Sequence, residues 1–131
     1  MKIYLDFDGT VVEHAYPKIG KYNKGAFEVI RKLQDAGHEI ILNTYRADCN
    51  DGTLEKARTY LDQATLIDPI LKFEKKKIEP HPWDWNYFKA NDLIFIDDIC
   101  KNSPLMAIQS STYEIVDWES LDKEFEEQGI Y

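Results

Sequence analysis

The sequence predicts an α/β protein of the doubly wound, Rossmann-like class, with a mostly parallel five-stranded sheet and helices on both faces. Two observations lead to this prediction. Short apolar segments alternate with amphipathic segments of helical period along the chain, which is the order that builds a parallel sheet covered by helices. Polar residues follow directly after several of the apolar segments, at the strand ends where α/β sheets place their binding sites.

Five segments have the length and the β-branched or aromatic content of buried strands. The first, KIYLDF, runs into the turn signal Asp8-Gly9-Thr10, and the second ends at Asn43-Thr44. Pro69 disfavours strand structure at the start of the third segment. In chain order, the predicted strands are residues 2–7, 39–42, 67–73, 92–97 and 113–116.

Amphipathic segments between these strands predict the helices. Asn23 is a suitable N-cap for the first helix, and Gly37 can supply the left-handed residue that ends it. The second helix is capped by Asp51 or Thr53. The predicted helices are residues 24–36, 53–64 and 118–128, with one or two further turns within 83–89.

Length and composition indicate one domain over residues 1–131, because a second domain would leave neither half a sizeable core. The formal net charge of −8 disfavours binding to nucleic-acid backbones or to anionic membranes. Apolar runs are too short to span a bilayer, and the first residues lack the apolar stretch of a secretion signal. Cys49 and Cys100 fit a reducing compartment. We therefore expect a cytoplasmic protein.

Acidic residues gather at the ends of two predicted strands. Asp6 and Asp8 belong to the first strand end, and Asp97 and Asp98 to the fourth. A single aspartate there is usually a turn former, but Asp6 lies inside an apolar run, where an unpaired carboxylate is costly. Carboxylates about 5 Å apart repel by roughly 3 kcal/mol per pair at an effective dielectric constant of about 20. Such a cluster needs protons or a cation, and oxygen ligands without a histidine or cysteine cluster favour Mg²⁺ as the cation.

These strand ends resemble the motifs of the haloacid dehalogenase (HAD) superfamily of phosphohydrolases. Residues 6–10 (DFDGT) resemble its first motif, residues 40–44 (IILNT) its second and residues 94–98 (IFIDD) its fourth. The resemblance implies a Mg²⁺-dependent phosphatase that hydrolyses a phosphomonoester through an aspartyl-phosphate intermediate. The insertions between strands are too short for a cap domain, which implies the small capless type, open to small molecules or macromolecular ends.

The resemblance also implies roles for individual residues. Asp6 corresponds to the nucleophile and Asp8 to the general acid and base, while Thr44 corresponds to the hydroxyl that bonds the phosphoryl group. The implied Mg²⁺ ligands are Asp6, Asp97, Asp98 and the backbone carbonyl of Asp8. Many members carry a further acidic residue, whose place Asn102 or a water would take here.

The resemblance also implies a catalytic lysine between the third and fourth strands. Lys77 is the favoured residue, since it is the last of a lysine run ahead of Pro80. Lys75, Lys76 and Lys89 remain alternatives.

Three other features stay open at this point. Residues 11–22, with His14, Tyr16 and Tyr22, overhang the site or form a plain surface loop. Arg46 contacts a substrate phosphate or forms a structural ion pair. The aromatic residues within 83–88 are more typical of a packing cluster than of a base-stacking platform.

Two other classes of function compete with the phosphatase. A phospho-accepting signalling receiver also uses acidic residues on such a sheet, but with its acceptor aspartate at the third strand, whereas the pairs here follow the first and fourth. A catalytically silent HAD-like binding module is disfavoured because the motif residues are present. The identity of the phosphorylated substrate and the oligomeric state do not follow from the sequence.

Overall fold

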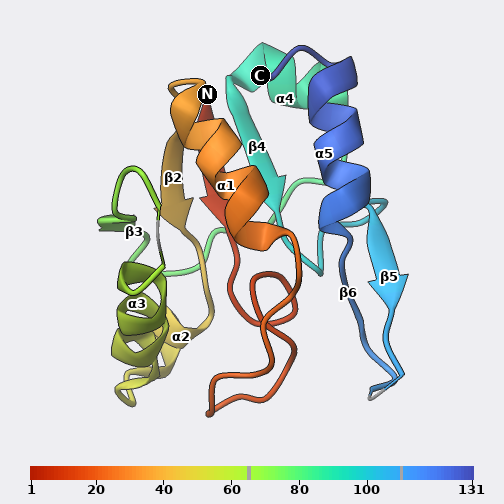
Figure 1. Cartoon of the computed structure of the whole chain (residues 1–131). Helices are drawn as coiled ribbons and strands as arrows, with labels where there is room; N and C mark the ends of the chain where they lie inside the picture. Colours follow the sequence, from red (N-terminus) through yellow and green to blue (C-terminus); the bar gives the residue numbers. More distant parts are fainter. Residues whose placement is uncertain (65, 110) are drawn as a thin grey trace.

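A parallel sheet forms the centre of the protein, and its strands run in one direction (Figure 1). The computed structural model describes residues 1–64, 66–109 and 111–131 of the chain. Over these residues the sheet has four strands: β1 (Lys2–Leu5), β2 (Glu39–Leu42), β3 (Lys72–Phe73) and β4 (Leu93–Ile96). They lie side by side in the order β3-β2-β1-β4. The strands predicted at 2–7, 39–42 and 92–97 are confirmed, and the fold is of the Rossmann-like α/β kind.

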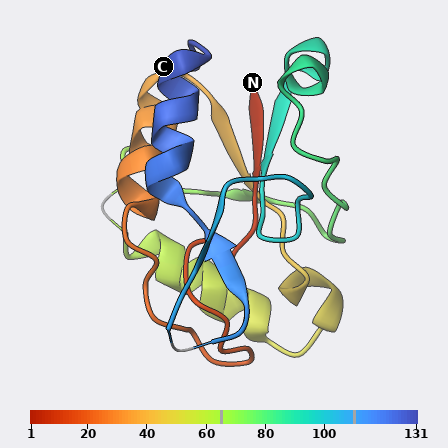
Figure 2. The same cartoon turned by 90° about the vertical axis from the view of Figure 1, so that its right-hand side faces the viewer.

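Helices lie on both sides of this sheet (Figure 2). The helices α1 (Ala26–Asp35) and α5 (Trp118–Glu127) cover one face, and α4 (Trp85–Asn91) lies on the other side, next to β4. Two more helices, α2 (Arg46–Cys49) and α3 (Thr53–Asp62), follow β2 and lie beyond the carboxyl end of the sheet (Figure 1). The sequence did not predict α2. No helix in the described ranges is long and apolar enough to cross a membrane.

The predicted fifth strand is where the structure departs from expectation. It becomes β6 (Glu114–Val116), which pairs antiparallel with β5 (Leu105–Ala107) in a separate two-stranded sheet. The amide of Val116 donates to the carbonyl of Gly9 at 3.0 Å, so β6 is held by the loop after β1 rather than by the edge of β4. The third strand is also shorter than predicted, in keeping with Pro69, which lacks the amide that a ladder needs.

The aromatic residues at 83–88 form a packing cluster, as predicted. The rings of Trp83 and Trp85 lie 5.1 Å and 5.8 Å from that of Phe88, edge to face. Trp85 also meets Phe125 of α5, at 5.9 Å between centroids. Both indole N–H groups donate to Glu124 Oε1. The cluster therefore fastens α4 and α5 together.

Asn23 was expected to cap the first helix, and this prediction is wrong. Gly25, in the left-handed region at φ 97°, occupies the cap position of α1 instead. The Asn23 side chain is buried and donates to the carbonyls of Thr10 and Val116, at 2.8 Å each. The indole of Trp118 donates to the same Thr10 carbonyl at 2.8 Å. Asn23 therefore connects the loop after β1 to β6.

We predict that Asn23→Ala lowers the free energy of unfolding by about 2 kcal/mol, because two buried carbonyls lose a donor. Urea denaturation would measure the change. Asn86→Ala, on the exposed face of α4, is the matched control and should stay within about 0.5 kcal/mol of the wild type. Equal losses in the two variants would contradict the bridging role of Asn23.

Candidate active site

The acidic strand ends meet between β1 and β4. The chain lays down β1, β2 and β3 in one direction and then returns to place β4 on the other side of β1. The point of reversal is where open α/β sheets bind ligands. Leu5 is in register with both Leu42 and Ile96. Asp6 and Asp97, the next residues on β1 and β4, are therefore brought side by side.

Three carboxylates converge at this point. Oxygens of Asp6, Asp97 and Asp98 all lie within 4.8 Å of one another. Lys77 Nζ lies 3.2 Å from Asp6 Oδ1 and 2.8 Å from Asp97 Oδ2. When all three carboxylates are ionised, they exceed this one ammonium by two negative charges, which a divalent cation would balance. Since all the donors are oxygens, the cluster fits a hard divalent cation.

Burial is the main cause of the pKa shifts of the two aspartates that contact Lys77. It raises the pKa of Asp6 well above its ordinary value, and the charge of Asp97 raises it further against the opposing effect of Lys77. Burial also raises the pKa of Asp97 to about 6, although Lys77 opposes the rise. Burial alone would lower the pKa of Lys77, but the two carboxylates outweigh it and hold that pKa above its ordinary value. The lysine is thus charged, and a cation would favour the ionised form of the carboxylates.

The segment after β3 delivers Lys77 to the cluster. Asn43, directly after β2, exchanges two hydrogen bonds of 2.8 Å with the backbone of Ile78. Asp48 Oδ2 accepts from the Lys77 amide at 3.3 Å. Asn43 was not singled out from the sequence, although a buried polar residue at the end of an apolar strand was the available signal.

The other three lysines considered from the sequence lie elsewhere. Lys75 and Lys76 are exposed, and Lys89 donates to Gln128 Oε1 at 2.7 Å. Of the four, Lys77 is the one whose ammonium contacts Asp6.

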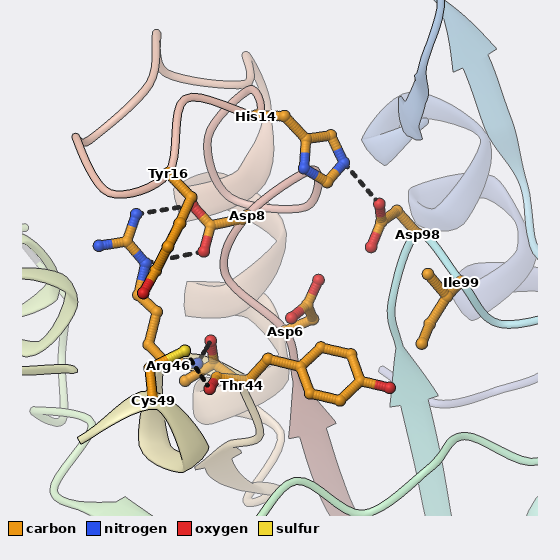
Figure 3. A pocket seen from close by; sticks show the side chains of 10 residues that line it. Asp6, Asp8, His14, Tyr16, Thr44, Arg46, Cys49, Asp98 and Ile99 are labelled. Atoms are coloured by element: carbon orange, nitrogen blue, oxygen red, sulfur yellow. Dashed lines mark hydrogen bonds and ion pairs between the residues drawn. The ribbon is translucent and has the colours of Figure 1, made fainter. Parts of the chain in front are cut away.

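Asp8 does not join the acidic cluster through its side chain. Its two carboxylate oxygens accept from Arg46 Nε and Nη2, each at 2.7 Å (Figure 3). The other Arg46 donors reach the carbonyls of Pro17, Lys18 and Thr53. All five N–H groups of the guanidinium are used in this way. Arg46 therefore forms a structural ion pair with Asp8, which is one of the two roles that the sequence left open for it. It also joins Asp8 to the 11–22 segment and to α3.

Two threonine hydroxyls border Asp6. Thr10 Oγ1 donates to Asp6 Oδ2 at 2.9 Å. Thr44 is buried and its Oγ1 accepts from the Arg46 amide at 3.2 Å. No acceptor for the Thr44 proton is found among the described residues, so the hydroxyl can donate into the adjoining cavity.

A cavity of about 230 Å³ lies over these groups. It is lined by Asp6, Asp8, Thr44 and Asp98 (Figure 3), and thus joins most of the predicted site. Lys77 and Asp97 do not line it, and they are buried at 7% and 1% exposure. Asn102 is exposed in a left-handed turn at φ 67° and does not line the cavity.

The segment 11–22 overhangs one side of the cavity. His14 Nε2 lies 2.7 Å from Asp98 Oδ2, and Tyr16 forms part of the wall (Figure 3). Tyr22 turns away and stacks on Phe27 at 4.8 Å between centroids. The contact between His14 and Asp98 joins residues 84 positions apart, and no local pattern in the sequence signals it.

Comparisons with known proteins add information on the fold. No protein-family model and no curated protein matches the chain. Among solved structures, the chain is similar to a conserved protein from Bacteroides thetaiotaomicron, at 26% sequence identity and a TM-score of 0.57. The match covers 98% of this chain and 91% of that one. The likeness therefore extends over nearly the whole α/β domain.

We predict that Lys77→Met, assayed without metal at pH 7, lowers the free energy of unfolding by about 3 kcal/mol. The substitution keeps most of the side-chain volume but leaves Asp6 and Asp97 without their buried counter-charge. Denaturation in EDTA would measure the loss. Lys75→Met, at an exposed position, is the control and should change stability by less than about 0.5 kcal/mol. A loss of the same size at Lys75 would refute the pairing.

We also predict that millimolar Mg²⁺ raises the melting temperature by several degrees. A ligand that binds only the folded state at one hundred times its Kd adds about 2.7 kcal/mol of stability. The shift should shrink in Asp97→Asn and persist in Asp92→Asn, whose carboxylate is exposed and outside the cluster. NaCl at matched ionic strength tests for general screening. An equal shift with NaCl would mean that the cluster holds no specific cation.

Proposed function

We propose that the protein is a Mg²⁺-dependent phosphatase of the HAD type, which hydrolyses a phosphomonoester through an aspartyl-phosphate on Asp6. The observation that supports this most is the cluster of Asp6, Asp97 and Asp98, whose first two members contact the Lys77 ammonium. Asp6 and Asp98 of this cluster line the same cavity as Asp8. A purely structural role would not require three carboxylates at a position where each adds repulsion.

In the first half-reaction, a carboxylate oxygen of Asp6 attacks the substrate phosphorus. The new bond joins Asp6 to phosphorus, and the bond from phosphorus to the leaving oxygen breaks. Thr10 and Lys77 hold the two Asp6 oxygens at 2.9 Å and 3.2 Å, which orients the nucleophile before the substrate arrives. Asp8 acts as the general acid toward the leaving oxygen.

In the second half-reaction, water attacks the phosphorus of the aspartyl-phosphate. Asp8 accepts a proton from this water, the bond between Asp6 and phosphorus breaks, and inorganic phosphate leaves. A carboxylate nucleophile thus divides the hydrolysis into two easier steps. Arg46 keeps the Asp8 carboxylate in one orientation through both of them, because it binds both oxygens.

A cationic group and a hydrogen-bond donor stabilise the negative charge of the phosphoryl group. The Lys77 ammonium lies beside Asp6, and the Thr44 hydroxyl can donate to a phosphoryl oxygen. When bound, Mg²⁺ would be held by Asp6, Asp97, Asp98 and the backbone carbonyl of Asp8, and would neutralise phosphate charge. Arg46 has no donor left for the phosphate, so its contribution is to position Asp8.

We also propose that the fold is of the doubly wound class and that the protein is cytoplasmic. Helices on both sides of the sheet support the doubly wound class, with the open site of capless members. The two unpaired cysteines, Cys49 and Cys100, support a reducing cytoplasmic location.

The phosphatase proposal predicts that Asp6→Asn reduces the hydrolysis of p-nitrophenyl phosphate by on the order of 10³-fold or more, because an amide does not attack phosphorus. Initial rates in Mg²⁺ and in EDTA would be measured, with Asp92→Asn as the matched control of full activity. Intact-mass analysis of acid-quenched wild-type protein would detect the phosphorylated form. Turnover that persists in purified Asp6→Asn would refute Asp6 as the nucleophile.

A further inference from the structure

The cavity has walls beyond the proposed catalytic groups, and these walls are largely aromatic and apolar. Tyr16, Tyr45 and Ile99 line the same cavity as Asp6 and Asp8. They are 45%, 45% and 49% exposed, so each presents a surface to a ligand. Such surfaces offer flat or apolar contact and carry no charge.

The Tyr16 ring lies beside a buried cation that also contacts the core. The Arg46 guanidinium lies over the Phe7 ring at 5.1 Å and over the Tyr16 ring at 5.3 Å. Exposure rises from 0% at Phe7 and 1% at Arg46 to 45% at Tyr16. The Tyr16 ring is thus the most exposed of these three groups, and it lies against a cation whose donors are all used. The exposed part of the ring is available to a flat ligand group.

Both tyrosine hydroxyls already have partners. The Tyr16 hydroxyl donates to Asp51, and the Tyr45 hydroxyl donates to Glu79. The Lys77 ammonium lies 4.3 Å from the centroid of the Tyr45 ring. Each ring is therefore held at its hydroxyl and beside a cation, and its polar end is not offered to a ligand. A hydroxyl-rich leaving group such as a sugar would find few partners on these walls.

We propose that Tyr16, with Tyr45 as a second wall, forms a stacking subsite for a planar aromatic leaving group. The substrate is then a small phosphomonoester that carries an aromatic ring. This inference rests on the proposed phosphatase function. Asp8 meets the leaving oxygen in that reaction, and Arg46 joins Asp8 to the Tyr16 ring, so the leaving group lies on the Tyr16 side. The carboxylates of Asp51 and Glu79 disfavour polyanionic substrates there.

The test compares benzyl phosphate with cyclohexylmethyl phosphate. Their leaving alcohols are similar in size and acidity, and they differ in whether the ring is flat and aromatic. We expect the wild type to favour benzyl phosphate by about two- to tenfold in kcat/KM, the range of a single aromatic pair. Because the chemical step is shared, any disturbance of Asp8 changes both rates and leaves their ratio unaffected.

Variants of Tyr16 and Tyr45 test whether these rings cause the preference for benzyl phosphate. Tyr16→Leu should bring the ratio close to one, whereas Tyr16→Phe, which keeps the ring, should retain it. Tyr45→Leu should reduce the ratio in part. Tyr87→Leu is the matched control, since Tyr87 belongs to α4 at the opposite end of the sheet from the cavity (Figure 1), and should leave the ratio at its wild-type value.

The outcomes separate this inference from the function on which it rests. Equal kcat/KM for the two esters in the wild type, or a wild-type ratio in Tyr16→Leu, overturns the stacking subsite and leaves the phosphatase proposal standing. If neither ester nor p-nitrophenyl phosphate is hydrolysed with Mg²⁺, the phosphatase proposal fails, and the subsite fails with it.

Discussion

The contact of Lys77 with Asp6 and Asp97 is the interaction on which the site depends. The register of β1 and β4 places two carboxylates side by side in the interior, where unpaired charges are costly. The ammonium compensates part of that cost, and the bonds from Asn43 to Ile78 hold the segment that carries it. Although the chain has a net charge of −8, it holds the Lys77 ammonium between the buried carboxylates of Asp6 and Asp97.

A second buried cation organises the other half of the cavity. Arg46 uses its five donors on the Asp8 carboxylate and on three backbone carbonyls, so it joins the end of β1 to the 11–22 segment and to α3. Lys77 and Arg46 follow one pattern: Lys77 pairs with Asp6 and Arg46 with Asp8, and each cation lies beside a tyrosine ring. The same two cations therefore position the aspartates and contact the tyrosine rings of the cavity wall.

The separate β5-β6 sheet supports the loop that carries Asp8. The Val116 amide bonds the Gly9 carbonyl, while Asn23 and Trp118 both bond the carbonyl of Thr10. Gly9 itself adopts φ 77°, a conformation that disfavours a side chain, so the loop turns directly after Asp8. The C-terminal part of the chain thus stabilises the first strand end, far from it in sequence.

Local sequence determined β1, β2 and β4, and the aspartates at the ends of β1 and β4, because strand pattern and turn signals act over a few residues. It also determined the end of the first helix, at Gly37 with φ 89°. The sequence favoured Lys77 among the candidate lysines, and the tertiary structure brings its ammonium to Asp6 through a segment that Asn43 holds. Tertiary structure alone decided which strand pairs with β6. It also decided the contact of Arg46 with Asp8, 38 positions apart. Such contacts depend on how distant segments pack once the chain has closed its loops, and no short pattern encodes that geometry.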